Sequence, residues 1–231
     1  MLLIDDAGVL IQLLRGKQQG KSHAESLQSF YAPQAHRYDD FRERLLHGRG
    51  DLVELLDPWP DDRIVELGAG TGRNIGFFDK RLKRLDLLTL VDLCPALLDV
   101  ARERARGLWN VQVVEGDATS WRPSRPADTV YFSYSLTMIP DWQAALDNAV
   151  SMLRPGGKIG VVDFHLPARY PALGRAFWRR WFGHDGVNLS DAHLPALQAR
   201  LETVALIERT APVPYLPGLR VPYYLYVGRK P

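Results

Sequence analysis

Three acidic residues, Glu66, Asp92 and Asp117, stand at or just after the ends of short apolar runs in the sequence. The runs have the length and composition of buried strands, so each acid is predicted to lie at a strand tip. Any one of them could equally be a solvated loop acid. Because parallel strands of one sheet end at the same edge, the three carboxylates together predict a binding site for a polar small molecule there.

Three glycines at alternate positions follow Glu66 in the stretch Glu-Leu-Gly-Ala-Gly-Thr-Gly. Glycines between a strand and a helix permit positive φ and let a ligand approach the backbone, while the helix start presents free N–H groups. Asp92, twenty residues after Gly72, is placed to accept hydrogen bonds from a ribose. Glu66 would repel a pyrophosphate but suits a cationic group such as an amino acid ammonium. The alternative is a plain strand–helix turn in another α/β protein.

The stretch from Ile64 to Asn74 resembles the first motif of the class I S-adenosylmethionine (AdoMet) methyltransferases, and Leu-Arg-Pro-Gly-Gly at 153–157 is similar to a later stretch of the same family. The resemblance implies an α/β, Rossmann-like fold: a seven-stranded, mostly parallel sheet with an antiparallel last strand and helices on both faces. It implies AdoMet as the cofactor, with Asp117 bonding the adenine amino group. The residues expected to bind the cofactor are Glu66, Gly68, Ala69, Gly70, Thr71, Asn74, Asp92, Leu93, Asp117, Ala118 and Ser133.

The chain divides into an N-terminal helical extension or cap at 1–57 and an AdoMet-binding methyltransferase domain at 58–231. Periodicity and breakers predict which segments are helices and which are strands. Helices are expected at 73–84, 96–106 and 191–201, with a further helix that Asp141 can cap. Strands are expected at 64–67, 87–92, 110–115, 127–133, 159–164, 202–213 and 221–228.

In small-molecule and lipid methyltransferases of this family, such an extension often lies over the cofactor. Tyr31 and Tyr38 are then candidates to close the site, although each could be an ordinary packing tyrosine. Tyr134 follows strand 127–133, whose loop reaches the reacting methyl group in this fold. Tyr38 and Tyr134 are predicted to position the acceptor, and His165, after strand 159–164, is a candidate base. The alternative for His165 is a surface loop histidine.

A narrower resemblance links the segments 132–140, 160–164, 177–182 and 220–224 to the N-methyltransferase of betaine-lipid synthesis, which trimethylates diacylglyceryl-homoserine. Arg179 and Arg180 are candidates to bind the substrate carboxylate, and Arg73 or Arg169 would serve equally. The arginines and aromatics of 169–182 favour peripheral contact with a membrane. The alternatives are an enzyme that methylates phosphatidylethanolamine, a quinone precursor or another small molecule, and a non-catalytic AdoMet-binding subunit.

Composition limits the remaining classes. The chain has 231 residues, a formal net charge of +2 and 46% hydrophobic residues, so a sizeable core can form and nucleic acid binding is not indicated. Cys94 is the single cysteine, which excludes an internal disulfide. No apolar run has the roughly 18 residues of a membrane span. We expect a cytoplasmic protein that uses no metal, with contact to the inner face of the membrane through 169–182.

Overall fold

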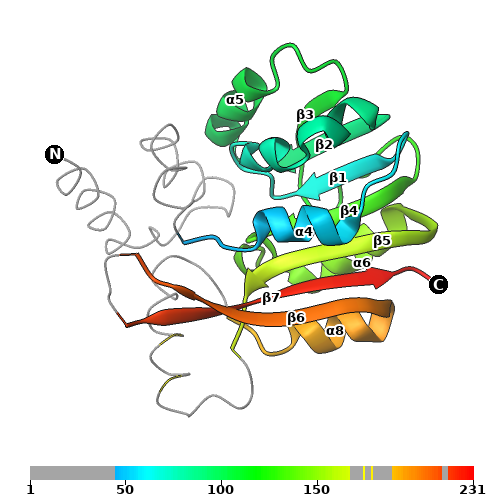
Figure 1. Cartoon of the computed structure of the whole chain (residues 1–231). Helices are drawn as coiled ribbons and strands as arrows, with labels where there is room; N and C mark the ends of the chain where they lie inside the picture. The colour runs from blue at the N-terminus through cyan, green and yellow to red at the C-terminus, as the bar shows by residue number, and fades with distance from the viewer. Residues whose placement is uncertain (1–44, 167–173, 175–177, 179–188, 215–217) are drawn as a thin grey trace, which may run out of the picture.

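The computed structural model describes residues 45–166, 174, 178, 189–214 and 218–231 (Figure 1). Helices and strands alternate along most of this part of the chain; η denotes a 3₁₀ helix. The elements are α4 (Arg49–Leu56), β1 (Arg63–Leu67), η2 (Arg73–Phe77), η3 (Asp79–Arg84), β2 (Leu87–Asp92), α5 (Pro95–Arg104), β3 (Val111–Glu115), β4 (Ala127–Ser133), η4 (Leu136–Met138), α6 (Trp142–Met152), β5 (Leu153–Phe164), α8 (His193–Arg200), β6 (Glu202–Pro212) and β7 (Arg220–Arg229).

The strands form one seven-stranded sheet in the order β3-β2-β1-β4-β5-β7-β6. β1 pairs in parallel with β2 and β4, and the parallel pairing continues to β3 on one side and β5 on the other. β7 is antiparallel to both β5 and β6. The predicted Rossmann-like sheet with an antiparallel last strand is therefore confirmed. The order reverses beside β1, which is where open α/β sheets bind ligands.

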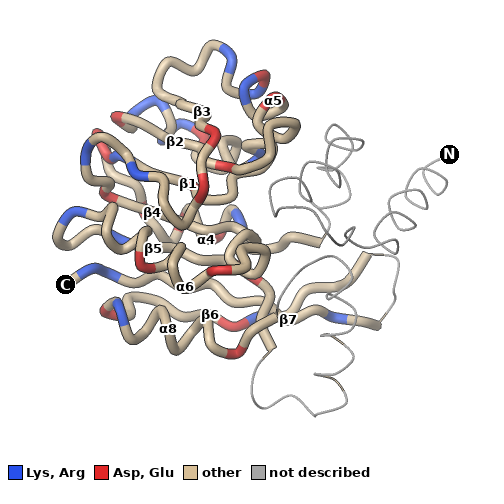
Figure 2. The backbone as a smooth tube through the Cα atoms, turned by 180° about the vertical axis from the view of Figure 1, so that it is seen from behind, with Lys and Arg blue, Asp and Glu red and all other residues tan. Residues whose placement is uncertain are grey.

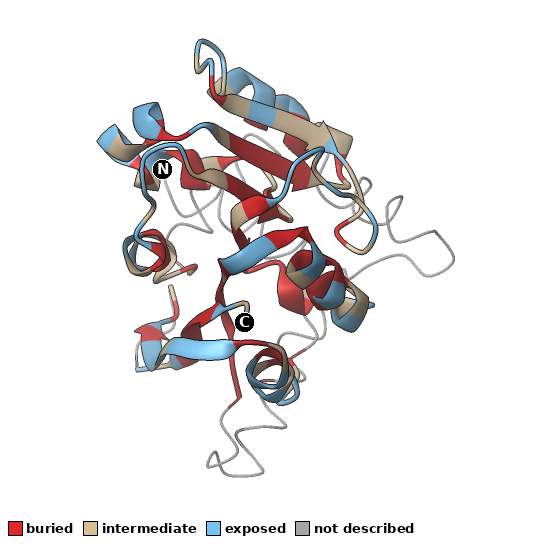
Figure 3. Ribbon diagram, turned by 90° about the vertical axis from the view of Figure 1, so that its right-hand side faces the viewer, coloured by how far each residue is buried: buried red, intermediate tan, exposed pale blue. Residues whose placement is uncertain are grey.

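Two hydrophobic cores cover the two faces of the sheet. On one face, α4, η2, η3 and α5 pack over residues such as Leu88, Leu90 and Tyr131. On the other face, α6 and α8 pack over residues that include Phe132 and Tyr226. Figure 3 shows buried strands between helices whose outer sides are exposed. Burial on both faces explains why these strands read as nearly continuous apolar runs in the sequence.

The helix α4 packs directly on the sheet. Gly160 of β5 makes this possible, because a Cβ there would lie 2.7 Å from Leu56 and 3.2 Å from Leu52. Leu52 and Leu56 are fully buried. Lys158 donates a hydrogen bond of 2.8 Å to the Leu56 carbonyl and so holds the end of the helix. The predicted domain division at residue 57 assigns α4 to the extension. In the structure, α4 packs directly against β5 of the sheet.

The predicted single helix at 73–84 is wrong. The segment forms two short 3₁₀ helices, η2 and η3, and Asp79, the first residue of η3, has a φ of 48°. A left-handed residue interrupts the repeating hydrogen bonds that a longer helix needs. Phe78, beside the break, is fully buried and lies 6.3 Å from the Tyr131 ring. The break turns Phe78 into the core, which the composition of the segment did not indicate.

Other predicted local features are close to the structure. Pro95 begins α5, and the Asp141 carboxylate caps α6 by accepting from the Ala144 N–H at 3.1 Å. β5 begins at Leu153, six residues before the start of the strand predicted at 159–164. Figure 2 shows basic and acidic residues interspersed along the described chain. None of the helices in this part of the chain is long and apolar enough to cross a membrane.

Candidate functional site

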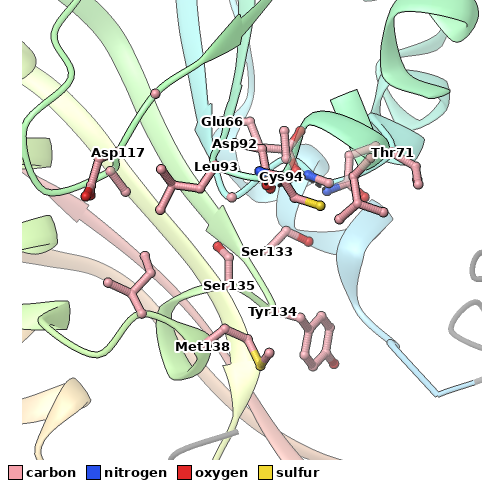
Figure 4. A pocket seen from close by; sticks show the side chains of 18 of the residues that line it. Glu66, Thr71, Asp92, Leu93, Cys94, Asp117, Ser133, Tyr134, Ser135 and Met138 are labelled. Atoms are coloured by element: carbon pink, nitrogen blue, oxygen red, sulfur yellow. Dashed lines mark hydrogen bonds between the residues drawn. The ribbon is translucent and has the colours of Figure 1, made fainter. Parts of the chain in front are cut away.

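A cavity of about 340 Å³ opens where β1, β2, β3 and β4 end (Figure 4). This is a volume typical of small-molecule sites, at the edge of the sheet where α/β folds bind ligands. All eleven residues expected from the sequence to bind a cofactor line it. They are Glu66, Gly68, Ala69, Gly70, Thr71, Asn74, Asp92, Leu93, Asp117, Ala118 and Ser133.

The glycine turn forms the floor of the cavity and requires its glycines. Gly68 has a φ of 75°, and a Cβ on it would lie 2.4 Å from the Cβ of Ser135. Gly72 has a φ of 69°, and a Cβ there would meet Leu90 at 3.0 Å and Ala101 at 3.2 Å. Larger residues would therefore push the turn away from both β4 and α5. The backbone is held close to the cavity in a conformation that L-residues rarely adopt.

Glu66 is buried at the tip of β1 between two donors. Its Oε1 accepts from Asn74 Nδ2 at 2.6 Å and its Oε2 accepts from the Tyr131 hydroxyl at 2.7 Å. Burial raises the pKa of Glu66 to about 7, against the lowering effects of Tyr131, Asn74 and Arg49. The Asn74 Oδ1 is buried with no hydrogen-bond partner in the structure. Glu66 and Asn74 therefore form a hydrogen-bonded polar pair in the wall of the cavity.

Asp92 joins the glycine turn to the tip of β2. Its Oδ2 accepts from the Gly70 N–H and its Oδ1 from the Cys94 N–H, both at 2.8 Å. Burial raises the pKa of Asp92, while these backbone bonds lower it. A carboxylate oxygen has more than one acceptor site, so Asp92 can still accept from ligand hydroxyls. Asp92 thus combines a structural role in the turn with the geometry expected of a ribose acceptor.

Asp117 occupies the tip of β3 on the same cavity. The Thr119 N–H and hydroxyl donate to its Oδ1, at 2.8 and 2.7 Å. Both bonds fall on one oxygen and fix the carboxylate at the wall of the cavity. The three acids at the strand tips are therefore brought together, as the sequence predicted. Their roles toward ribose, adenine and ammonium stay predictions.

The loop after β4 forms the other wall. Tyr134 has a φ of 54°, which is costly for a bulky residue and is held by its surroundings. Its hydroxyl donates to the His47 carbonyl at 2.6 Å, and its ring lies 4.7 Å from Phe164. Tyr134 lines the cavity, but its hydroxyl fastens the segment before α4. Its predicted role in positioning the acceptor stays a prediction.

A buried carboxylate holds this loop from behind. Asp163, near the end of β5, accepts from the Thr137 N–H at 3.0 Å and from the Thr137 hydroxyl at 2.8 Å. The Phe164 N–H donates to it at 2.8 Å. Burial raises the pKa of Asp163 to about 6, although these hydrogen bonds lower it. Asp163 therefore fixes η4, whose Met138 faces the cavity.

His165, predicted as a catalytic base, is not in the cavity lining, so the structure gives it a different place. Its side chain is buried, its Nε2 lies 2.7 Å from Glu208 Oε1, and its ring packs edge-on against that of Tyr224, with the ring centroids 5.6 Å apart. The antiparallel pairing of β6 and β7 brings Glu208 beside it. His165 is therefore a buried histidine in contact with Glu208 and not the surface loop histidine of the alternative, and its role as a base stays a prediction.

Several predicted residues lie outside the described part of the chain: Tyr31, Tyr38, Arg179 and Arg180. Of the predicted membrane segment 169–182, only Gly174 and Trp178 are described. Trp178 is 3% exposed and belongs to the core on the α4 face of the sheet. A buried side chain cannot enter a lipid headgroup region. The aromatic residues predicted to contact the membrane therefore do not include Trp178.

Other lining residues were not predicted from the sequence. They are Leu46, Arg49, Cys94, Leu97, Gly116, Thr119, Ser135, Met138, Ile139, Pro140 and Asp141, together with Arg73, which was named only as an alternative carboxylate ligand. No sequence pattern indicates that Arg49 lines the cavity, because nothing in the spacing of the extension points there. The sequence does indicate a special role for Asp163, which lies behind the cavity wall, because a carboxylate inside an apolar strand needs buried partners.

Comparison with known proteins agrees with this geometry. Residues 64–157 match the sequence family described as "Methyltransferase domain". Aklanonic acid methyltransferase DauC from Streptomyces sp. (strain C5) is 31% identical over 111 residues, which cover 47% of this chain and 50% of DauC. The ubiquinone/menaquinone biosynthesis C-methyltransferase UbiE of Shewanella halifaxensis is 28% identical over 119 residues, covering 50% of this chain and 47% of UbiE.

A similar solved structure is that of the N-methyltransferase NodS from Bradyrhizobium japonicum WM9, in complex with S-adenosyl-L-homocysteine. Its TM-score is 0.68 at 22% identity, over 91% of this chain and all of NodS. The chain spans about half the length of the curated relatives it matches. The sheet therefore has the Rossmann-like methyltransferase fold, and residues 64–157, which form most of its cavity edge, match a methyltransferase domain.

Proposed function

We propose that this protein is an AdoMet-dependent methyltransferase acting on a small organic acceptor with an apolar body. The observation that carries the proposal is the glycine turn surrounded by three strand-tip acids on one cavity. Bound AdoMet would supply an electrophilic methyl group. Asp92 and Asp117 would hold the nucleoside, and Glu66 the ammonium of the methionine part. The relatives named as methyltransferases support this assignment.

The acceptor would enter between the loop after β4 and the segment before α4. Leu46, Tyr134, Met138, Ile139 and Pro140 line this part of the cavity and are largely apolar. Such a wall can orient a substrate and exclude water from the transferred methyl group. It would place the acceptor atom at roughly 3 Å from that group, as an in-line displacement requires. The proposed acceptor is therefore a molecule whose reactive atom is attached to a large apolar group.

Two acceptor classes fit that description. The first is the amine of a lipid head group, most specifically diacylglyceryl-homoserine, which the resemblance of the later half of the sequence favours. The second is a ring carbon of a quinone precursor, which the similarity to UbiE supports. Both present a polar reactive part on an apolar tail, and the apolar lining suits either. We propose the lipid amine as the first candidate and the quinone precursor as the second.

One incubation separates the two acceptors. Protein with methyl-labelled AdoMet and a total lipid extract should yield one labelled product, identified by mass spectrometry. A product with label on nitrogen supports the lipid amine, and label on a ring carbon supports the quinone precursor. AdoMet binding without any labelled product, also with soluble acceptors, would favour the non-catalytic AdoMet-binding subunit.

Membrane contact is tested separately, by cosedimentation with anionic liposomes at low and high salt. A lipid acceptor stays in the bilayer, since each buried CH₂ contributes about 0.8 kcal/mol. The protein should therefore sediment at low salt and be released as salt rises. Protein that stays in the supernatant at low salt while methylating a soluble acceptor would defeat the lipid candidate.

A further inference from the structure

Two tryptophans are the most exposed large hydrophobic side chains in the part of the chain that the structure describes. Trp109 is 78% exposed and Trp59 is 67% exposed. Trp59 precedes β1 and Trp109 precedes β3, and the parallel pairing of β1, β2 and β3 places the starts of these strands at one edge of the sheet. This edge lies opposite the cavity, and Figure 3 is seen from its side. Tryptophan is enriched in protein interfaces, so its exposure here indicates a contact surface.

The backbone beside each tryptophan is held in place. Asn110, which is 3% exposed, donates from Nδ2 to two backbone carbonyls at the end of η3, at 2.6 and 3.0 Å, and so fixes the residue after Trp109. The Trp59 N–H donates to the Asp62 carboxylate at 2.7 Å, which closes the turn before β1. Both indoles are therefore carried on fixed backbone, and a contact with them would cost little ordering of the chain.

A groove of about 490 Å³ lies at the same edge, where β1, β2, β4 and β5 begin. Three arginines and three aspartates line it: Arg63, Arg125, Arg154, Asp61, Asp86 and Asp128. Each arginine lies within 4.0 Å of one of these aspartates. The two signs are balanced, so the groove suits neither a nucleic acid nor an anionic lipid surface, which both require an excess of positive charge.

The balanced groove suits an aromatic side chain, because guanidinium groups stack on aromatic faces. The side chain of Arg125 is 71% exposed and its ion pair with Asp86 is long, at 4.0 Å, so its guanidinium is able to turn onto a ring. The same edge carries such a ring in Trp109. The starts of β3 and β1 are roughly 10 Å apart, so the tryptophan and the groove are neighbours along the edge.

A protruding side chain next to a groove is what a two-fold interface requires, because each copy then gives its side chain to the groove of the other. We propose that this edge forms a homodimer, in which Trp109 of one copy enters the groove of the other and stacks on its Arg125. Trp59 would be covered at the rim. The proposal goes beyond the methyltransferase function and does not depend on it, since both cavities stay open at the opposite edge of each sheet.

The available area predicts a weak dimer. A fully covered tryptophan side chain buries roughly 150–250 Å². Because Trp59 and Trp109 are largely exposed, the four tryptophans of a dimer supply on the order of 500 Å², and the surface that covers them adds a similar area. The total of about 1,000 Å² is the lower limit for a specific interface, so we expect a dissociation constant in the micromolar range.

Sedimentation equilibrium over a wide range of concentration tests the dimer. The wild type should change from the mass of one chain to that of two. Trp109→Ala should weaken dimerisation by about 30-fold or more, the loss for a hot-spot residue. The matched control is Leu206→Ala, which removes another exposed apolar side chain, but from β6 at the far end of the sheet. It should leave dimerisation unchanged, and the melting temperature of each variant shows that it is folded.

A mixture of two variants tests the exchanged contact itself. Trp109→Ala and Arg125→Gln should each dimerise weakly alone, because each damages both contacts of its own homodimer. A mixed dimer pairs the intact tryptophan of one variant with the intact groove of the other and so keeps one contact. The mixture should therefore dimerise about fivefold or more tightly than either variant, the square root of the loss in a homodimer.

Three results would overturn the proposal. Wild-type protein that stays a single chain at every concentration would exclude the second copy. If that protein also cosediments with uncharged liposomes and Trp109→Ala does not, the edge binds a membrane surface instead. A dimer weakened by Leu206→Ala but not by Trp109→Ala would place the interface on β6. A mixture no tighter than its components would show that Trp109 does not enter the groove of the other copy.

Discussion

The carboxylate oxygens of Asp92 hold the glycine turn and are also the proposed acceptors for the nucleoside. Replacing it with alanine removes the acceptor of the Gly70 and Cys94 N–H groups as well as the expected ribose acceptor. Affinity for S-adenosylhomocysteine should fall by at least the 1.5–3 kcal/mol typical of charged hydrogen bonds, roughly 10- to 150-fold. Calorimetry measures it, with Asp99→Ala on the exposed side of α5 as the control. An unchanged affinity would remove the ribose assignment.

Glu66 should make stability depend on pH. Its pKa is about 7 in the folded protein and 4.5 as the ordinary value. Between these values the folded state holds more protons than the unfolded state, so the free energy of unfolding falls as pH rises and levels off above 7. The full effect is on the order of 3 kcal/mol. Asp163, with a pKa of about 6, acts in the same direction over a lower window.

His193 opposes this slope, because burial lowers its pKa from 6.5 to about 4, so that stability rises with pH across that range. The contribution of Glu66 is therefore measured as the difference in free energy of unfolding between Glu66→Gln and the wild type. Urea unfolding between pH 5 and 8 should show that the variant becomes more stable relative to the wild type as pH rises. A difference independent of pH would contradict a raised pKa at Glu66.

At the scale of elements, the loop after β4 depends on Asp163. Asp163→Asn keeps the shape but presents an N–H₂ group where two oxygens accepted from Thr137. One donor would then face another, and η4 should loosen. Hydrogen exchange should become about tenfold faster or more in a peptide covering 134–140 and stay unchanged at 64–72.

Asp128→Asn is the matched control for this variant. Asp128 lies at the other end of β4, where it accepts from the Arg63 N–H at 2.9 Å and pairs with Arg154. Its exchange effects should be confined to that end of the sheet. Equal acceleration at 134–140 in both variants would mean that Asp163 stabilises the fold in general and does not hold the loop in particular.

The elements predicted best from the sequence are the strands that are buried on both faces. Strands buried on both faces appear as apolar runs, and the acids stand out because they come at or just after the ends of these runs. The prediction of one helix at 73–84 was wrong because Asp79 adopts a positive φ beside the buried Phe78, a tertiary arrangement that the composition of the segment does not indicate. Arg49 and Asp163 could not be assigned because the contacts that place them, with Phe77 and Thr137, join segments 26 or more residues apart.

At the scale of the molecule, the cavity joins elements from much of the sheet edge. Its lining comes from the tips of β1, β2, β3 and β4 and from α4, η2, α5 and η4. A ligand there should therefore stabilise the whole domain and not one loop. Net charge and composition alone could not have located this cavity, since the formal charge is only +2 and charges of both signs are interspersed.

Ligand binding should raise the melting temperature cooperatively. At one hundred times its dissociation constant, S-adenosylhomocysteine should add about 2.7 kcal/mol to the free energy of unfolding. For a domain of this size that corresponds to a rise of roughly 5–10 °C. Scanning calorimetry at several ligand concentrations checks both the size of the shift and its logarithmic growth. Asp92→Ala should need at least tenfold more ligand for the same shift. A transition that splits in two on binding would show that α4 and the sheet do not unfold together, against the packing at Gly160.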